Sequence, residues 1–535
     1  MNTNRDSQGF DAIVIGAGFA GLYMLHRLRA VGLSVCGIEA GDDVGGTWYW
    51  NRYPGARCDV DSLDYQFAFS DELQRGWTWT ERYATQPEIQ RYLSYVADHL
   101  DLRQLIHFRN RVTSAAFDEA DSNWRVETDA NRAFTARYCI AAVGCLSAAQ
   151  VPDIPGLGDF SGAWYHTGQW PEAPVDFADC RVGVIGTGSS GIQAIPIIAQ
   201  EAADLVVFQR SPSFSVPARN AALPNDVVEA YKDEFLSQRA AACQTDFGNS
   251  TWQSLPSALE EDSAARVAEY ERRWQIGGAG FMVTYADLMV DKAANDTAAD
   301  FLRDKIAAIV EDQEVARRLM PFDYPIGAKR LCVDTDYYAT FNRANVRLVD
   351  LRDEPIEAIT PNGIRTQAAD YAVDCLVFAT GFDAMTGPLT RIDLRGRDGL
   401  SLAEQWQESP QCYLGVAIAG FPNLFTITGP GSPSVLSNMV LSIEQHVEWI
   451  ADCITHLQAC GATTIEAQPD AQADWAVQVD EVAATTLFPQ GNSWYIGANV
   501  PGKPRVFMPY TGGVRAFREI CDAVVANEYA GFTFS

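Results

Sequence analysis

Two glycine-rich segments, far apart in the chain, constrain the fold more than any other feature of the sequence. The first reads FDAIVIGAGFAGLYMLHRLRAVGLSVCGIEAG, and the second reads CRVGVIGTGSSGIQAIPIIAQEAADLVVFQRS. Each pattern predicts an apolar strand, a tight glycine turn, a helix and a second strand, the unit with which Rossmann-type folds bind a dinucleotide. We therefore predict an α/β protein with two Rossmann-like dinucleotide-binding domains.

The first glycine turn is followed by an acidic residue at the end of the second strand. Gly16, Gly18 and Gly21 have the GxGxxG spacing, which allows the turn, the approach of a pyrophosphate and the packing of the helix. Glu39 stands where a carboxylate accepts hydrogen bonds from a ribose diol. This site is expected to bind FAD or NAD.

The second turn has the same spacing, but its second strand ends in a basic residue. Gly186, Gly188 and Gly191 form the turn, with Ser189 inside it, and Arg210 closes the strand. A guanidinium forms two charge-assisted bonds to a 2′-phosphate, which a carboxylate would repel. The sequence predicts NADP here, and the alternative is that Arg210 is only a solvated strand end.

Two dinucleotide sites in one chain suggest a flavin that is reduced by a nicotinamide. The apolar segment CLVFATGFDA resembles the point where a chain returns to a flavin domain. We predict a first FAD-binding segment over 1–145, an NADP-binding domain over 146–382 and a second FAD-binding segment over 383–535. Residues from about 221 to 325 have apolar spacings of three and four, which predict a helical insertion in the NADP domain.

Composition and charge exclude several other classes of protein. The chain has 535 residues, too many for one ordinary core, and 47% of them are apolar, as in globular proteins. Its 40 basic and 69 acidic residues give a net charge of −29, which disfavours binding to nucleic acid or to anionic membranes. We expect no signal segment before the first strand and no membrane span.

The twelve cysteines are scattered singly, without a CxxC pair. This pattern argues against a zinc site and against a dithiol redox centre. We therefore expect no bound metal and a cytoplasmic location, where thiols stay reduced. The sequence makes no prediction of the oligomeric state.

Between the two turns lies FSGAWYHTGQWP, which has the pattern FxGxxxHxxxWP. The matching residues are Phe160, Gly162, His166, Trp170 and Pro171. Another run, GGTWYWNRYPGARCD, carries Gly46 and Trp48, which are expected to contact the cofactor, and Asp59. With both motifs the chain resembles the type I Baeyer–Villiger monooxygenases over essentially its whole length. The motifs are most similar to those of phenylacetone and steroid monooxygenases.

The resemblance implies an enzyme that uses FAD, NADP(H) and dioxygen to convert a ketone to an ester or a lactone. In this family the reduced flavin takes up oxygen at C4a, and the resulting peroxide attacks the ketone to give a Criegee intermediate. The alternative is a flavin N- or S-oxygenase acting on soft nucleophiles, although such enzymes generally lack the terminal Trp170–Pro171 pair. A disulfide reductase, which would need paired redox cysteines, is disfavoured, and a non-catalytic flavin sensor is a third alternative.

The family's catalytic arginine falls on Arg330 in YPIGAKRLCVDTDYY, and the resemblance implies that Asp59 pairs with it. Arginine suits the role because it stays charged and does not protonate a nucleophilic peroxide. The resemblance gives the NADP phosphate to Lys329, with Arg210 and Ser211. Close relatives often have histidine at the position of Ser213, so a less strict preference for NADPH over NADH is expected.

The remaining assignments concern the linker, the substrate and a lid. His166 is expected to be structural and to couple movement of the NADP domain to the flavin domain. The resemblance places the loop TGPGSPSVLSNM over the flavin's substrate side, and its length favours aryl or bulky ketones. Trp494 is expected to belong to a mobile lid. The residues expected to line the substrate pocket are Cys145, Ser434, Val435, Leu436 and Met439.

Overall fold

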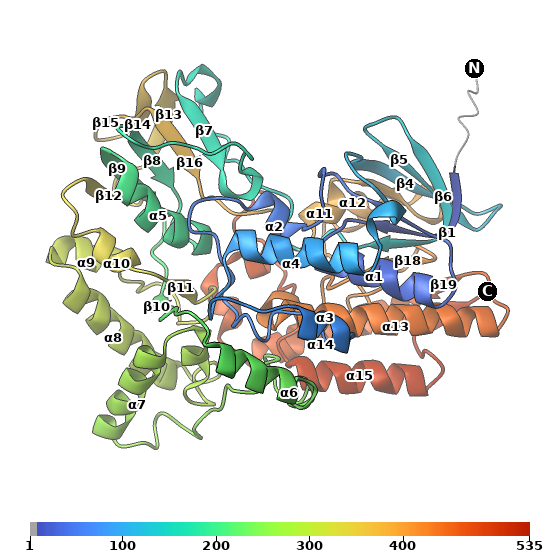
Figure 1. The fold of residues 1–535 in the computed structure, drawn as a ribbon. Helices are drawn as coiled ribbons and strands as arrows, with labels where there is room; N and C mark the ends of the chain where they lie inside the picture. The colour runs from blue at the N-terminus through green and yellow to red at the C-terminus, as the bar shows by residue number, and fades with distance from the viewer. Residues whose placement is uncertain (1–7) are drawn as a thin grey trace.

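The computed structural model describes residues 8–535, which form two lobes around separate sheets, with helices below and between them (Figure 1). The α/β architecture with parallel sheets that the two glycine turns predict is confirmed. Residues 1–7, on which part of the expectation about a signal segment falls, lie outside the described residues.

The larger sheet takes strands from both halves of the chain. Its order is β17-β4-β5-β6-β1-β2-β3, and β18 also pairs with β6. The strands are β1 Gln8–Ile15, β2 Val35–Ile38, β3 Ile106–His107, β4 Val112–Asp118, β5 Asn123–Thr128, β6 Ala133–Ala141, β17 Asp393–Arg395 and β18 Leu424–Thr426. Helix α1 (Phe19–Ala30) crosses between the parallel strands β1 and β2. Residues 393–426 thus complete a sheet that residues 8–141 begin.

The smaller sheet has the order β12-β9-β8-β16-β7, and all of its neighbouring pairs are parallel. Its strands are β7 Ala163–His166, β8 Arg181–Ile185, β9 Asp204–Gln209, β12 Val346–Asp350 and β16 Cys375–Phe378. Helix α5 (Ser189–Glu201) crosses from β8 to β9. The antiparallel strands β13 (Ile356–Thr360), β14 (Gly363–Thr366) and β15 (Asp370–Ala372) pack an apolar face against this sheet.

A group of helices lies below the smaller sheet, in the region where the sequence predicts an insertion (Figure 1). It consists of α6 (Asn225–Ala242), α7 (Ser263–Ile276), α8 (Lys292–Ile309) and α9 (Gln313–Leu319). Asp262, Asp291 and Asp312 cap the last three helices, because each carboxylate accepts main-chain N–H bonds from the first turn. Tyr270 and Phe301 belong to an aromatic core that holds this group together.

Shorter elements connect these layers. The remaining helices are α2 Thr47–Trp50, α3 Asp71–Gly76, α4 Gln86–His99, α10 Tyr337–Thr340, α11 Gly387–Thr390, α12 Leu402–Gln405, α13 Met439–Ala459, α14 Pro469–Ala484 and α15 Val514–Ala526. The remaining strands pair as β10 (Ser215–Pro217) with β11 (Cys332–Asp334) and β19 (Ile465–Ala467) with β20 (Phe532–Phe534). Helices α1 and α13 pack together, which joins the two ends of the chain in one core.

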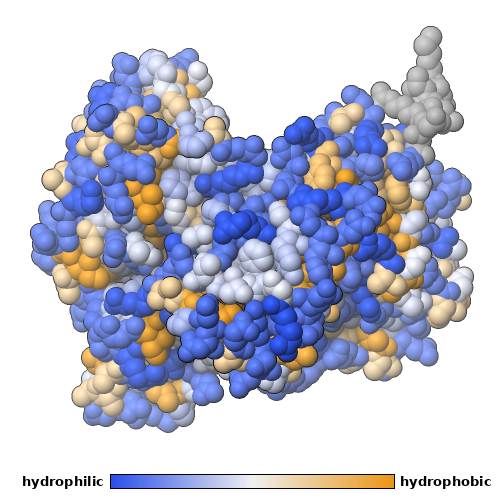
Figure 2. All heavy atoms as spheres, in the orientation of Figure 1, coloured by the Kyte–Doolittle hydropathy of each residue, from blue (hydrophilic) through white to orange (hydrophobic). Residues whose placement is uncertain are grey.

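The surface is mostly hydrophilic on the face shown, and its outline is hollowed between the two lobes (Figure 2). None of the helices in residues 8–535 is both long and apolar enough to cross a membrane. In the same residues, no cluster of three or more His, Cys, Asp or Glu side chains is arranged to hold a metal ion. All twelve cysteines are free, and Cys460 is exposed.

Candidate active site

The first glycine turn brings main-chain atoms into close contact. Gly16 has a φ of +105°, and a Cβ atom on it would lie 2.6 Å from the carbonyl oxygen of Ala142. A Cβ atom on Gly21 would lie 1.9 Å from the carbonyl oxygen of Gly16. A Cβ atom on Gly18 would lie 3.3 Å from the Cα atom of Gly46. The two runs that the sequence singles out therefore face each other at the start of α1.

Trp48 and Glu39 are buried beside this turn. The Trp48 indole donates to the Tyr65 hydroxyl at 3.2 Å. The Glu39 carboxylate accepts main-chain N–H bonds from Ala17 at 2.7 Å and from Gly41 at 2.6 Å, and burial raises the pKa of its carboxyl. Because each carboxylate oxygen has a second lone pair, Glu39 still has acceptor capacity for a donor such as a ribose hydroxyl.

The second turn repeats the geometry of the first. A Cβ atom on Gly186 would lie 2.4 Å from the carbonyl oxygen of Ala379, and one on Gly191 would lie 2.3 Å from that of Gly186. The Ser189 hydroxyl, in the first turn of α5, lies 3.4 Å from the sulfur atom of Cys332. The same close packing of turn, helix and neighbouring strand therefore occurs in both sheets.

Helices α1 and α5 begin without a side-chain cap, unlike α7, α8 and α9. Gly18 and Gly188 are their N-cap residues, and in the described part of the chain no cap side chain bonds to the first-turn N–H groups. Free N–H groups at a helix start attract a phosphate, because the helix dipole adds to their positive charge. A Cβ atom on Gly188 would meet nothing within 4 Å. Both turns thus fit the pyrophosphate of a dinucleotide.

Two cations lie near each other at the end of β9. Arg210 is exposed, and the Lys329 Nζ atom lies 4.4 Å from the centroid of the Tyr324 ring. Burial, and next the positive charge of Arg210, lower the pKa of Lys329. Within residues 8–535 neither cation forms an ion pair. Two unpaired cations that repel each other fit a ligand phosphate placed between them.

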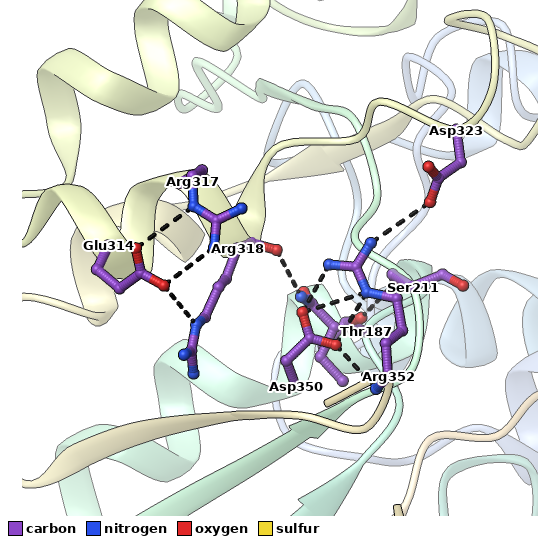
Figure 3. Close-up of polar contacts among 9 residues, drawn as sticks. Thr187, Ser211, Glu314, Arg317, Arg318, Asp323, Asp350 and Arg352 are labelled. Atoms are coloured by element: carbon purple, nitrogen blue, oxygen red, sulfur yellow. Dashed lines mark hydrogen bonds and ion pairs between the residues drawn. The ribbon is translucent and has the colours of Figure 1, made fainter. Parts of the chain in front are cut away.

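The neighbouring arginines are already paired with carboxylates (Figure 3). Arg352 pairs with Asp350 at 2.6 Å and with Asp323 at 3.4 Å. Glu314 accepts ion pairs from both arginines of α9, at 3.0 and 3.1 Å. Their charge is therefore neutralised locally, whereas the charge of Arg210 and Lys329 is available to a ligand.

Ser211 and Ser213 flank this site in different ways. The Thr187 hydroxyl donates to the main-chain carbonyl of Ser211 at 3.1 Å (Figure 3). The Ser213 hydroxyl donates to the carbonyl of Thr187 at 2.9 Å. The Ser213 hydroxyl thus donates its hydrogen bond to the glycine loop and holds that loop in place.

His166, the histidine of the FxGxxxHxxxWP fingerprint (residues 160–171), is buried at the end of β7. The Nδ1 atom of His166 accepts the main-chain N–H of Gly168 at 3.0 Å, so the proton of the neutral ring is on Nε2, which lies 3.3 Å from the Thr380 hydroxyl. Thr380 in turn donates to the carbonyl of Gln150 at 2.6 Å. Burial lowers the pKa of His166 to about 4. The ring is therefore neutral near pH 7 and links three segments of the chain.

The rest of the fingerprint joins the two lobes. The main-chain N–H of Trp170, which precedes Pro171, donates to the carbonyl of Trp50 at 3.2 Å. Glu172 pairs with Arg52 at 3.1 Å. Phe160 packs on the smaller sheet, and a Cβ atom on the neighbouring Gly162 would lie 2.1 Å from the carbonyl oxygen of Asp374.

The structure brings Arg330 and Asp59 together. The Nε atom of Arg330 donates to Oδ2 of Asp59 at 3.1 Å, and its Nη2 atom donates to both carboxylate oxygens at 2.9 Å. The Nη1 atom donates to the Val435 carbonyl at 2.7 Å. The charge of Asp59 raises the pKa of Arg330 further, so the guanidinium stays charged. One fixed cation therefore faces the loop that the sequence assigns to the substrate.

A cavity of about 90 Å³ lies beside this ion pair, between residues 59–60, the helical region 247–331 and the C-terminal segment 435–495. Arg330, Asp59, Val435 and Leu436 line it, so four residues that the sequence assigns to catalysis and substrate share one space. Its remaining walls are mostly apolar. The volume of the cavity is small beside the roughly 300–1,000 Å³ of typical ligand pockets.

Three other residues that the sequence predicts for the substrate pocket are not among the described residues that line the cavity. Cys145 and Met439 belong to the apolar cluster behind its wall, and burial raises the pKa of Cys145 to about 11. Ser434 is a buried polar residue in the same loop as Val435. The Ser434 hydroxyl donates to the Met385 sulfur at 3.7 Å. Trp494 is partly buried in the same cluster, with its ring 4.4 Å from that of Tyr495.

Several lining residues are absent from the sequence predictions. Tyr495 and Phe488 come from the segment around Trp494, while Phe247, Asn249 and Trp252 come from the loop after α6. Tyr495 could have been found as the neighbour of Trp494 in the lid motif. The loop after α6 has no spacing or motif that points to a site.

Comparisons with known proteins identify the family of this chain. The pyridine nucleotide-disulphide oxidoreductase family matches residues 13–241, which include both glycine turns. A Baeyer–Villiger monooxygenase of Pseudooceanicola batsensis is 42% identical, covering 99% of this chain and 97% of its own. A phenazine N-monooxygenase of Lysobacter antibioticus is also 42% identical, covering 99% and 98%. A solved structure of an oxidized steroid monooxygenase bound to NADP is 49% identical, with a TM-score of 0.94 and coverage of 98% and 99%.

These relatives cover 98–99% of the chain at 42–49% identity, and the solved structure shares its fold. The chain therefore belongs to the Baeyer–Villiger monooxygenase family of flavoproteins. FAD and NADP(H) are its cofactors.

Proposed function

We propose that Arg330, oriented by Asp59, is the catalytic cation of this monooxygenase, which converts ketones to esters or lactones with NADPH and dioxygen. The observation that carries the proposal is the fixed ion pair, which lines a cavity with mostly apolar walls. When bound, FAD accepts hydride from NADPH and activates dioxygen for transfer to the ketone. The protein has to bind and orient the ketone and to exclude water.

Arg330 acts through charge. Its guanidinium stays protonated, so it stabilises negative charge on the carbonyl oxygen of the ketone as the carbon–oxygen bond forms. Two of its nitrogen atoms are held by Asp59 and a third by the Val435 carbonyl, which fixes the direction of the charge. No proton has to move from the arginine in this role.

We assign FAD to the first turn and its partner loop. The residues are Gly16, Gly18, Gly21, Glu39, Gly46 and Trp48, with Trp494 closing over the cofactor. We assign NADP(H) to the second turn and the two unpaired cations. The residues are Gly186, Gly188, Ser189, Gly191, Arg210, Ser211 and Lys329.

We propose that the FAD-binding domain consists of 1–145 and 383–535, with the NADP-binding domain, 146–382, between them. Strands β17 and β18 in the larger sheet support the two-segment arrangement. His166 then holds the linker in place, since its two nitrogen atoms bond to different segments. Twelve free cysteines fit a cytoplasmic location.

The cavity admits a small ketone as it stands. The aryl or bulky ketones favoured by the substrate loop need more space, which a shift of one wall would supply. A second activity, N-oxygenation, is favoured by the phenazine N-monooxygenase among the relatives. A nitrogen nucleophile would need no cation to stabilise a carbonyl oxygen, so the fixed Arg330 supports the ketone reaction more directly.

A product assay tests the proposal. The purified flavoprotein is incubated with NADPH, labelled dioxygen, and separately with acetone, cyclohexanone, phenylacetone, a thioether and phenazine. An ester or lactone that carries one labelled oxygen is expected with at least one ketone. An N-oxide or sulfoxide without any ester would assign the enzyme to the other class of oxygenase.

A further inference from the structure

A single loop separates the substrate cavity from a second, larger hollow. The outer hollow has a volume of about 510 Å³, and polar residues such as Gln244, Asp246 and Arg515 line it. Phe247, Asn249 and Trp252 line both spaces. We define the wall segment as residues 244–254. Because three of its residues line both spaces, a shift of this segment toward the outer hollow would widen the inner cavity.

The wall segment is anchored at its centre by a buried carboxylate. The Nδ2 atom of Asn249 donates to Oδ2 of Asp64 at 2.8 Å, and both residues are buried. The Oδ1 atom of Asn249 accepts the main-chain N–H of Thr251 at 2.9 Å and its hydroxyl at 2.8 Å. The Asn249 side chain thus connects the fold of the wall segment to Asp64.

Asp64 is itself held in place from several directions. Its Oδ1 atom accepts the Tyr231 hydroxyl at 2.6 Å. Its main-chain carbonyl accepts bonds from Arg239 at 3.2 Å and from the side chain of Asn438 at 2.9 Å. Arg239, in α6, also pairs with Glu444 of α13 at 2.7 Å. A carboxylate fixed in this way gives the wall segment a defined position.

The wall segment has two further main-chain contacts. The N–H of Asn438, the N-cap of α13, donates to the carbonyl of Phe247 at 2.9 Å, and the N–H of Val514 donates to that of Asp246 at 2.9 Å. These bonds hold the first part of the segment. The part that carries Asn249 and Trp252 is held by three side-chain contacts: Asn249 donates to the Asp64 carboxylate, Ser250 donates to Gln238 at 2.8 Å, and Arg273 donates to the Gln253 carbonyl at 2.6 Å. Of these contacts, the one to Asp64 is buried.

We propose that Asp64 is a positioning residue that sets the size of ketone this enzyme accepts, by anchoring the wall segment through Asn249. The inference rests on the proposed function of the Arg330 site. With the anchor in place, the wall closes on a small ketone. Without it, the wall moves toward the outer hollow, which weakens the fit of a small ketone and admits a larger one.

The test exchanges the two side chains that form the anchor. In Asp64→Asn a single acceptor oxygen faces two donors, Asn249 Nδ2 and the Tyr231 hydroxyl, so residue 64 accepts only one of these two hydrogen bonds; Asn249→Ala removes the Asn249 bond alone. In the double variant Asp64→Asn with Asn249→Asp, residue 64 donates and residue 249 accepts, so the hydrogen bond returns with its direction reversed. Tyr231→Phe is the matched control, because it removes the second side-chain hydrogen bond to the Asp64 carboxylate and leaves the Asn249 contact intact.

The readout is the ratio of kcat/KM for phenylacetone to kcat/KM for acetone. Loss of a buried hydrogen bond to a charged group predicts a shift of about tenfold toward phenylacetone in Asp64→Asn. The double variant is expected to return to within about threefold of the wild type, and Tyr231→Phe is expected to keep the wild-type ratio. An unchanged ratio in Asp64→Asn, a double variant no closer to wild type, or an equal shift in Tyr231→Phe would overturn the proposal.

Hydrogen exchange in residues 244–254 gives a second readout that needs no turnover. Faster exchange in Asp64→Asn, reversed in the double variant, is expected, and unchanged exchange would overturn the proposal. Where Asp64→Asn does not retain FAD, Asn249→Ala removes the same bond, and the same results are expected. A wild type that makes no ester from either ketone contradicts the proposed function, while the exchange result still decides the role of Asp64.

Discussion

Arg330 and Asp59 are separated by 271 positions in the chain, and they form a two-pronged ion pair at the edge of the cavity. The carboxylate engages Nε and Nη2, while Nη1 is bonded to the Val435 carbonyl. The guanidinium plane cannot rotate without breaking one of these contacts. Asp59 therefore supplies orientation as well as charge, and the two effects are separable by substitution.

Asp59→Asn keeps the shape of the side chain but replaces one acceptor oxygen with a donor that faces Arg330. We expect ester formation to slow by about 10- to 100-fold, since a charge-assisted pair contributes about 1.5–3 kcal/mol. Reduction of the flavin by NADPH should keep its wild-type rate. Product assays and stopped-flow absorbance measure the two steps. Asp393→Asn, which breaks an exposed pair with Arg395, is the control and should change neither step.

Arg210→Ala tests the assignment of the NADP phosphate. The KM for NADPH should rise by at least tenfold, while the KM for NADH changes little, because only NADPH carries the 2′-phosphate. Arg317→Ala is the control, since that arginine is already paired with Glu314. Equal rises for the two nucleotides would show that Arg210 does not read the phosphate.

Gly188→Ala separates folding from nucleotide binding. A methyl group there meets nothing within 4 Å, so the melting temperature and the FAD content should remain near the wild-type values. NADPH should bind at least tenfold more weakly, because the methyl group occupies the space next to the helix start. Gly18→Ala, where the added Cβ lies 3.3 Å from Gly46, should lose FAD instead. Wild-type NADPH affinity in Gly188→Ala would contradict the assignment.

His166 predicts a pH dependence of stability. Its pKa is about 4 in the folded protein and about 6.5 in an unfolded chain. Above pH 6.5 the ring is neutral in both states. As the pH falls from 6.5 to 4, the unfolded chain takes up a proton that the folded protein does not, so the folded state loses stability, by roughly 2 kcal/mol at pH 5.

His166→Gln removes the group whose protonation causes this loss of stability at low pH. The melting temperature of the variant should be lower than that of the wild type at pH 7.5, because the variant loses the ring's contacts. It should then fall less than that of the wild type between pH 7.5 and pH 5. Equal falls would indicate that the ring is accessible to protons in the folded protein.

The parts of this molecule that local pattern determines could be predicted from the sequence. Gly16 and Gly186 occupy positions where backbone packing excludes a side chain, so the spacing alone indicates both turns. The Arg330–Asp59 pair came from family resemblance, because no local spacing joins such distant residues. The Asp64–Asn249 contact joins residues 185 positions apart, and neither a local spacing nor the family resemblance indicated it. It arises only when the helical group packs on α13.

The substrate pocket shows the same limit. The loop motif indicates the correct region, and Val435 and Leu436 line the cavity. Ser434 points its hydroxyl toward Met385 instead, because the chain turns there with a φ of +42°. Which residues of one loop face a cavity depends on such turns, and apolar spacing does not encode them.

The most direct test of the central claim follows one turnover of Arg330→Ala with phenylacetone or acetone, whichever the wild type converts, and labelled dioxygen. Removal of a cation about 4 Å from the reacting oxygen, at an effective dielectric of about 20, costs roughly 4 kcal/mol, or about a thousandfold in rate. The variant should therefore be reduced by NADPH at the wild-type rate and yield no detectable labelled ester. Arg330→Lys keeps a charge without the two-pronged contact, so its rate of ester formation should lie between the rates of the wild type and of Arg330→Ala. Labelled ester formed by Arg330→Ala at the wild-type rate would contradict the role given to Arg330.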